Sequence, residues 1–345
     1  MNALVNMAKK AYDNYPGLCK SLGLFDLLTA APYRPHYMKR IDEKMNEFMR
    51  GAITVEFEVT NLCNADCIMC PNGIMERPIA RMDMDLFKKI VDEIAAANMP
   101  LIKFVFAGIG EPTIDTRLHE KIRYLKEKMP KIPVQLTTNA SLLTEKKSRE
   151  LIDAGLDRTT ISFNGTTKES YEAVMGKMNY EKTMANLMTF LSLRKDGKPH
   201  ITLSCVRLDA NAKDFAGLEQ FWRDKGVQVD GYKTPIPFNR GGDKMSYRSK
   251  WALPKPTAPR HMYPCRMMAE NLLIHPNGTV VQCFVDYEES KLLGQFGKDT
   301  LKQIMDTKRQ WYEDWKRGDF SKTPLCQNCT FMSEQVVSWW KEDYF

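Results

Sequence analysis

Apolar and polar residues alternate along residues 53–59, where Ile53, Val55, Phe57 and Val59 take every second position. This period-two pattern predicts a strand with one buried face. Downstream, segments of this kind alternate with segments in which apolar residues recur at helical spacing. Further strands are predicted at residues 101–106, 134–139, 158–163, 200–207 and within 227–238, and helices at residues 83–97, 117–129, 144–154, 180–194 and 214–225. Because strands that alternate with helices form parallel β/α units, the chain is predicted to have an α/β fold.

The two ends of the chain differ from this alternating centre. Residues 1–52 are rich in Met, Lys and aromatic residues and are broken by prolines, which predicts a helical N-terminal extension with no assigned chemistry. Residues 239–262 are expected to form a basic linker, and residues 263–345 a second, C-terminal domain. The alternating segment, residues 53–238, is the expected main domain.

Composition narrows the classes of protein. The chain of 345 residues is 43% hydrophobic and 27% charged, which is ordinary for a globular protein. Its net charge of +7 is spread over interspersed acidic and basic residues, so we expect no nucleic-acid partner. No segment has the ~18 apolar residues of a membrane span, and Lys9, Lys10 and Asp13 interrupt any signal-peptide core. We therefore expect a cytoplasmic protein with no membrane partner. Seven of its nine cysteines fall into two groups typical of metal sites, which suits a reducing compartment.

The first cysteine group follows the first predicted strand directly. Cys63, Cys67 and Cys70 have the spacing C-x3-C-x2-C on the loop that leaves this strand. Three thiols so close together can surround one soft metal centre. A structural zinc ion needs four ligands, one more than this group supplies, whereas an iron–sulfur cluster can be held by three thiolates with one iron left open. The spacing alone leaves both interpretations open.

The spacing and its position after a first strand resemble the radical S-adenosylmethionine enzymes, whose motif is C-x3-C-x-Φ-C with a residue at Φ that is usually aromatic. Met69 takes the Φ position here, which departs from that pattern. The resemblance covers residues 53–238 and implies a partial (β/α)6 TIM-like barrel. It also implies that Cys63, Cys67 and Cys70 hold a catalytic [4Fe–4S] cluster whose open iron binds S-adenosylmethionine, with Met69 beside that cofactor.

The other unusual residues of this segment fall at the C-terminal ends of predicted strands, which is where barrels of parallel β/α units carry their chemistry. Gly108, Gly110, Glu111 and Pro112 resemble the G-G-E-P segment of the family, which implies a contact with the ammonium group of the cofactor. The resemblance implies further cofactor contacts at later strand ends, namely Thr138, Asn139, Ser162, Asn164 and Arg207. The alternative for all of these residues is ordinary turn chemistry or a solvated strand end.

The second cysteine group is a set of four: Cys265, Cys283, Cys326 and Cys329. Between the first two lies a predicted hairpin with Asn277-Gly278 at its tip. Four thiolates can hold a structural zinc ion. The pattern C-x(9–15)-G-x4-C followed by C-x2-C is also similar to the accessory domains of radical S-adenosylmethionine enzymes, called SPASM in the long form and twitch in the short one. Four cysteines match the short form, which implies one auxiliary [4Fe–4S] cluster with no open iron.

Two more residues have alternative roles. Cys205, on the strand predicted at 200–207, is either a small buried hydrophobe or a thiol that faces the barrel interior and donates a hydrogen atom to the substrate. Arg248, between the two domains, is either a linker residue or a substrate contact.

The resemblance implies a radical oxidoreductase. A 5′-deoxyadenosyl radical would abstract a hydrogen atom from a small polar substrate, for example a sugar-like one, and the auxiliary cluster would accept an electron. The implied protein partner is an electron donor such as flavodoxin or ferredoxin. Three alternatives stay open: a radical epimerase, a maturase that acts on a peptide substrate, and a metal-binding module without turnover.

Overall fold

The computed structural model describes residues 39, 43, 46, 52–235 and 265–331. Strands and helices alternate through the larger of these segments, as the sequence predicts. The strands are β1 (Ile53–Phe57), β2 (Leu101–Phe106), β3 (Val134–Thr138), β4 (Arg158–Ser162), β5 (His200–Ser204), β6 (Gly231–Lys233), β7 (Asn271–Ile274), β8 (Thr279–Val281) and β9 (Leu292–Gln295). The α-helices include α5 (Met84–Ala97), α6 (Leu118–Lys128), α7 (Glu145–Asp153), α8 (Lys168–Met175), α9 (Tyr180–Ser192), α10 (Leu218–Asp224), α11 (Arg266–Glu270) and α12 (Leu301–Lys316). Short 3-10 helices are η1 (Pro71–Ile74), η2 (Pro112–Ile114), η3 (Asp209–Gly217) and η5 (Pro324–Gln327).

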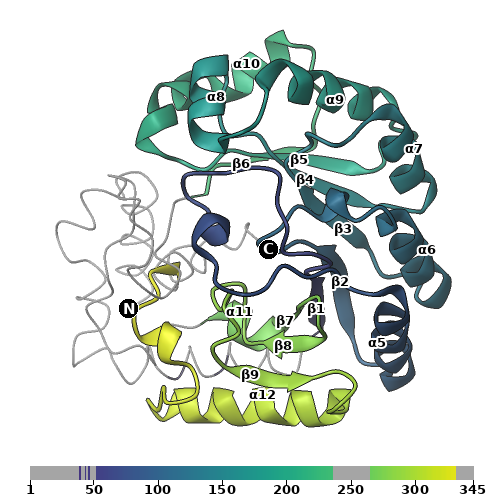
Figure 1. The fold of residues 1–345 in the computed structure, drawn as a ribbon, viewed down its shortest axis with the longest axis vertical. Helices are drawn as coiled ribbons and strands as arrows, with labels where there is room; N and C mark the ends of the chain where they lie inside the picture. Colours follow the sequence, from purple (N-terminus) through teal and green to yellow (C-terminus); the bar gives the residue numbers. More distant parts are fainter. Residues whose placement is uncertain (1–38, 40–42, 44–45, 47–51, 236–264, 332–345) are drawn as a thin grey trace.

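In the described part of the chain, nine strands form one sheet with the order β6-β5-β4-β3-β2-β1-β7-β8-β9. The first six strands are parallel and lie in sequence order, so the predicted partial barrel is confirmed. The C-terminal hairpin extends this sheet, because β7 pairs with β1 in parallel and places Asn271 opposite Thr54. The sheet curves, with α5 to α10 along its outer side and the loop after β1 on its inner side (Figure 1).

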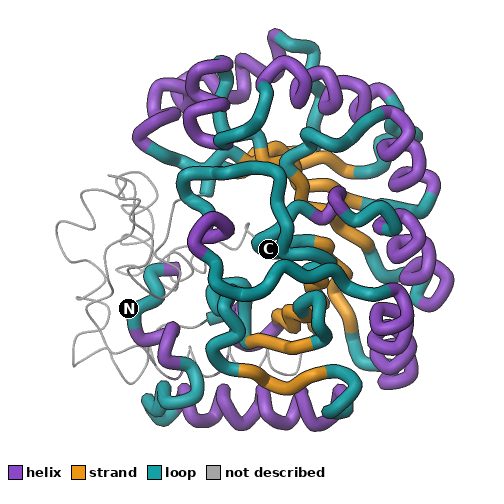
Figure 2. The backbone as a smooth tube through the Cα atoms, in the orientation of Figure 1, coloured by secondary structure: helices purple, strands orange, loops and turns teal. Residues whose placement is uncertain are grey.

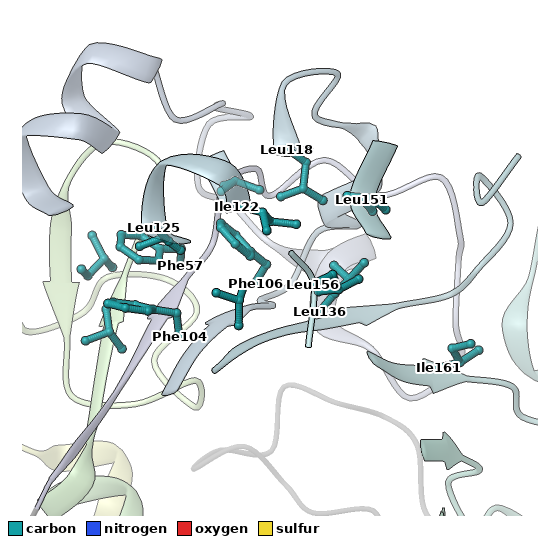
Figure 3. Close-up of a cluster of buried hydrophobic side chains, with 14 of the residues drawn as sticks. Phe57, Phe104, Phe106, Leu118, Ile122, Leu125, Leu136, Leu151, Leu156 and Ile161 are labelled. Atoms are coloured by element: carbon teal, nitrogen blue, oxygen red, sulfur yellow. The ribbon is translucent and has the colours of Figure 1, made fainter. Parts of the chain in front are cut away.

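The two faces of the curved sheet differ in polarity. The outer face carries buried apolar residues that pack under the helices (Figure 3), including Phe57, Phe104 and Phe106. The Phe57 ring lies 5.0 Å from that of Phe87 on α5 and 5.9–6.2 Å from those of Phe106 and Phe104. The inner face carries half-buried polar residues at the alternate positions: Thr54, Glu56, Lys103, Gln135, Thr160 and Thr202. Apolar burial on one side therefore holds the helices, while the other side offers hydrogen-bonding groups.

Helix starts follow capping chemistry that is visible in the sequence. The side chain of Asp83 accepts hydrogen bonds from the backbone N–H groups of Asp85 and Leu86, and Thr144 caps α7 in the same way through Lys147. Each cap satisfies N–H groups that have no partner within the helix. The predicted hairpin tip is also confirmed, because Gly278 has a φ of +83° between the antiparallel strands β7 and β8.

Three features differ from the predictions. Neither α8 nor α12 was predicted from the sequence, and the single helix expected at residues 214–225 is η3 followed by α10. The strand expected at 200–207 ends at Ser204, so Cys205 and Arg207 lie on the loop beyond it. Most of the proposed extension 1–52 and linker 239–262 lies outside the described residues, as do Cys19 and Arg248.

Candidate functional site

The C-terminal ends of the parallel strands lie at one edge of the sheet, and the loops that leave them meet at the inner side. In Figure 2 these loops are the teal segments inside the arc of orange strands. The cysteine loop, residues 61–71, leaves β1 and reaches toward the end of α8. The strand ends that the sequence analysis selected are therefore brought together as predicted.

The helix α8 holds the cysteine loop. Backbone N–H groups of Asp66 and Ile68 donate to the carbonyls of Met175 and Val174 at 3.2 and 3.0 Å. Gly176, with a φ of +44°, closes this helix, and a Cβ there would come within 2.2 Å of the Asp66 carbonyl oxygen. A glycine is needed at this close approach, so the turn after α8 sets the position of the loop.

The end of β3 holds the loop from the other side. Asn64 donates to Ser141 Oγ at 2.9 Å, and its own Oδ1 accepts a hydrogen bond from Asn139 Nδ2 at 3.0 Å. Asn139 was predicted to contact the cofactor. In the structure it joins the cysteine loop to β3, so any cofactor contact would be additional to that role.

The segment 108–112 packs directly beneath the cysteine loop. A Cβ on Gly110 would lie 2.1 Å from the Thr60 carbonyl oxygen, so only glycine fits there. The carboxylate of Glu111 is buried and accepts hydrogen bonds from Thr113, Thr138 Oγ1 and the backbone N–H of Asn139, at 2.5–3.0 Å. These donors come from two strand ends, so Glu111 is a positioning residue that fixes both loops; its predicted contact with a cofactor ammonium group stays a prediction.

The remaining predicted cofactor residues are close to this edge but differ in their contacts. Asn164 is buried and its amide is used within the protein, because Oδ1 accepts from the Val206 N–H at 2.8 Å. Ser162 and Met69 are half-buried. Arg207 donates to Thr234 Oγ1 at 3.2 Å and stacks on Phe215, with its guanidinium 5.3 Å from the ring centroid. The Asn164 side chain thus stabilises the turn after β4, whereas Ser162 and Met69 have side-chain surface available for a ligand.

Cys205 packs with the outer face of the sheet. It is buried with Leu203 and Trp222 in the core under the helices, and Asn211 Nδ2 lies 3.6 Å from its sulfur. Burial raises the pKa of the Cys205 thiol to about 12. This placement supports the small buried hydrophobe, and it gives no support to a hydrogen donor inside the barrel.

A buried network of charges that was not predicted from the sequence joins residues on either side of the cysteine loop to the C-terminal hairpin. Glu58 accepts hydrogen bonds from the Ile109 N–H at 2.8 Å and from Arg77 Nη2 at 2.6 Å. Arg77 also contacts Glu289 at 3.2 Å, and Glu289 lies 3.0 Å from Nδ1 of His275. We call Glu58, Arg77, His275 and Glu289 the charge clasp. Because its members are distant in sequence, no local pattern could reveal it.

Hydrogen bonds within the clasp keep Glu289 ionised. Burial would raise the pKa of Glu289, but hydrogen bonds from His275 and Asn277 outweigh this effect and lower the pKa to about 2. Removing one member of such a network leaves another charge buried without its partner. The clasp also includes backbone contacts, since the Glu288 carboxylate accepts from the N–H groups of Glu76 and Arg77 at 3.0–3.2 Å.

The second cysteine group surrounds a cavity between the hairpin, α12 and η5. Its lining includes all four predicted ligands: Cys265, Cys283, Cys326 and Cys329. Gln282 Oε1 and Thr323 Oγ1 are buried on the same lining and have no hydrogen-bond partner in the described part of the chain. Buried polar atoms without partners favour a cavity that takes up a group able to contact them.

The thiols of both sites fit metal-bound groups. Burial raises the pKa of Cys63 to about 11 and of Cys265 to about 12, and it also raises the pKa values of Cys67 and Cys283. A metal that binds these sulfurs displaces their protons. In the described ranges, no three Cys, His, Asp or Glu side chains converge closely enough to hold one ion. Four cysteine sulfurs on one cavity lining can hold either a [4Fe–4S] cluster or a zinc ion.

Two family models match the chain. The model of the Radical SAM superfamily matches residues 57–216, and that of the SPASM iron–sulfur cluster-binding domain matches residues 265–330. The chain therefore carries a radical SAM domain followed by a SPASM domain. These domains imply S-adenosylmethionine and a [4Fe–4S] cluster in the first and further iron–sulfur ligation in the second.

Individual relatives refine this assignment. The S-adenosyl-L-methionine-dependent 2-deoxy-scyllo-inosamine dehydrogenase of Niallia circulans is 22% identical over 292 residues, 82% of this chain and 94% of that protein. The tungsten-containing aldehyde ferredoxin oxidoreductase cofactor-modifying protein of Pyrococcus furiosus is 29% identical over 176 residues, which span 50% of this chain and 48% of that protein. The chain thus matches about half the length of the second relative.

Solved structures show the same fold. BtrN in complex with AdoMet and 2-DOIA has a TM-score of 0.57 and 19% identity, covering 81% of this chain and 92% of BtrN. SuiB of Streptococcus suis bound to its precursor peptide SuiA has a TM-score of 0.59 and 14% identity, covering 85% and 74%. In the part of this chain that the structure describes, no helix is long and apolar enough to cross a membrane.

Proposed function

We propose that the protein is a radical S-adenosylmethionine oxidoreductase that dehydrogenates a small polar metabolite, with the cluster of the SPASM domain as electron acceptor. When bound, the cofactors would supply a 5′-deoxyadenosyl radical for hydrogen abstraction and an iron–sulfur centre for the second electron. The dehydrogenase relative, which matches 82% of this chain, supports this class of reaction.

The cavity lined by four cysteines carries the proposal. Four thiolates saturate a [4Fe–4S] cluster, so this group would accept electrons without binding the substrate. Cys265 and Cys283 flank the hairpin that pairs with β1, the strand that leads into the cysteine loop. Both sites therefore belong to one continuous sheet, which fixes their separation.

The residues of the chain would bind and orient the cofactors and the substrate, and would exclude water from the site. We assign cluster ligation to Cys63, Cys67 and Cys70, and expect Gly108, Gly110 and Pro112 to form a close backbone wall for S-adenosylmethionine. We propose that four further residues line the same site: Ser162, Thr138, Asn139 and Arg207. The half-buried polar residues on the inner face of the sheet, Gln135 and Thr160 among them, suit a substrate with hydroxyl groups.

The placement of Cys205 favours oxidation over epimerisation. An epimerase of this class must return a hydrogen atom to the substrate radical, and the candidate thiol packs under the helices instead. An oxidase needs no such donor.

We also propose flavodoxin or ferredoxin as the reductant and the cytoplasm as the location, with Arg248 as a candidate substrate contact.

The test is anaerobic incubation of the reconstituted protein with S-adenosylmethionine, a reductant and a panel of aminocyclitols and sugars. We expect formation of 5′-deoxyadenosine together with a product lighter than the substrate by two hydrogens. The control is Cys283→Ala, which should lose product while it still cleaves some S-adenosylmethionine without substrate. A product of unchanged mass that carries solvent deuterium would instead identify an epimerase.

A further inference from the structure

Lys308 of α12 is a fully buried lysine close to the auxiliary site. Its exposed fraction is 0%, and its Nζ donates one hydrogen bond, 2.8 Å long, to the carbonyl of Asn271. Among the described residues it has no carboxylate partner within ion-pair distance. A buried ammonium group strongly destabilises the folded chain unless an opposite charge compensates it.

Lys308 lies beside the segment that carries two cysteines of the cavity, since its hydrogen-bond partner Asn271 falls between Cys265 and Cys283. Burial lowers the pKa of Lys308 to about 8, and the charge of these two cysteines, which become thiolates when they hold a cluster, favours its protonated form. The reverse effect acts on Cys265, whose thiolate Lys308 stabilises. Trp311, one helical turn beyond Lys308, lines the cavity itself. Lys308 therefore lies close to the cavity and interacts electrostatically with two of its cysteines.

Its position is unusual for this helix. Lys302 is 84% exposed and pairs with Asp306, and Arg309 is 64% exposed and pairs with the same carboxylate. Surface pairs of this kind contribute little and are screened by solvent. Only a buried charge acts strongly on a neighbouring redox group, because the surrounding dielectric is low.

We propose that Lys308 is the counter-charge of the auxiliary cluster and raises its reduction potential, which makes this cluster a better electron acceptor. The inference rests on the proposed function and deepens it. Four thiolates give the cluster a net negative charge, and each added electron increases that charge. A fixed cation beside two of the ligands stabilises the reduced form more than the oxidised form.

The experiment is a potentiometric titration followed by electron paramagnetic resonance. The full chain carries Cys63→Ala, Cys67→Ala and Cys70→Ala so that only the auxiliary cluster contributes a signal. Lys308→Met and Lys308→Gln remove the charge, and Gln keeps a hydrogen-bond donor for Asn271. Lys308→Arg keeps the charge, and the exposed Lys302→Met is the matched control.

We expect both neutral variants to shift the reduction equilibrium at least tenfold toward the oxidised cluster, which is about 59 mV for a one-electron couple. The reduction potentials of Lys308→Arg and Lys302→Met should differ from that of the unchanged chain by less than a third of that shift. Loss of the cluster from both neutral variants, but not from Lys308→Arg, would also support a counter-charge. An unchanged potential with full iron content, or loss of the cluster from all three Lys308 variants, would assign Lys308 a structural role only.

This result is distinguishable from a failure of the proposed function. If the auxiliary site of the unchanged chain takes up zinc rather than iron, the proposed function fails and the inference about Lys308 falls with it. If the iron–sulfur cluster forms and its reduction potential does not depend on Lys308, only the inference about this lysine is wrong.

Discussion

The carboxylate of Glu111 shows at the residue scale how the site is held in shape. It accepts hydrogen bonds from donors on the loops after β2 and β3, and the next residue, Pro112, begins η2. A buried carboxylate that accepts several such bonds is replaced poorly even by its amide. Glutamine has one acceptor oxygen, and its NH2 group would face a donor.

Glu111→Gln should therefore destabilise the protein by about 1–3 kcal/mol and weaken S-adenosylmethionine binding, because the wall formed by Gly108 and Gly110 would shift. Denaturant unfolding and equilibrium binding measure the two effects. Glu120→Gln, an exposed carboxylate paired with Arg117, is the control and should change neither. Wild-type stability and affinity in Glu111→Gln would remove Glu111 from the positioning role.

Cys205 gives a second prediction at this scale. Cys205→Ala removes one buried sulfur from the core between β5 and α10, which should cost about 1–2 kcal/mol of stability. Iron content and most of the activity should remain, since the thiol lies away from the inner face. Complete loss of turnover in a folded, fully loaded variant would restore the hydrogen-donor hypothesis.

At the scale of elements, the charge clasp joins the segment after the cysteine loop to the hairpin of the SPASM domain. Arg77 also donates to the Tyr287 carbonyl at 2.7 Å. The loop after β8 therefore contacts this segment through a backbone carbonyl as well as through side chains. Motion of the hairpin would disturb Glu58 and, through Ile109, the segment 108–112 that we propose as a wall of the cofactor site. The clasp thus links the two domains mechanically.

The pH dependence of stability tests the clasp. Because the pKa of Glu289 falls from 4.5 to about 2 on folding, this carboxylate contributes stability above pH 4.5 that is lost as the pH falls toward 2. Glu289→Gln should be less stable than the wild type by about 1–3 kcal/mol at pH 7, and the difference should shrink below pH 4.5. Glu313→Gln on α12 is the exposed control. A difference that is independent of pH would contradict the assignment.

Local patterns predicted much of the fold and the position of the site. Alternation predicted β1 to β5, apolar residues at helical spacing predicted α5, α6, α7 and α9, and the cysteine spacings selected the two cysteine groups. The pairing of β7 with β1 could not be predicted, since it joins strands more than 200 residues apart without a local signal. Glu58 and His275 were missed for the same reason, because only the folded chain brings these distant residues together.

At the scale of the whole molecule, one sheet carries both cysteine groups. The cysteine loop leaves β1, and the auxiliary cavity lies at the hairpin that pairs with the same strand. Each group has its own set of ligands, so the loss of one cluster should leave the other in place. The proposed function therefore requires two independent iron–sulfur sites on a common sheet.

Metal analysis of the anaerobically reconstituted chain tests this requirement most directly. We expect about eight iron atoms per chain, four for each cluster, and about four in the variant with Cys63, Cys67 and Cys70 all changed to Ala. That variant should fold and should not cleave S-adenosylmethionine. Iron near zero in the unchanged protein, with stoichiometric zinc in its place, would contradict the account.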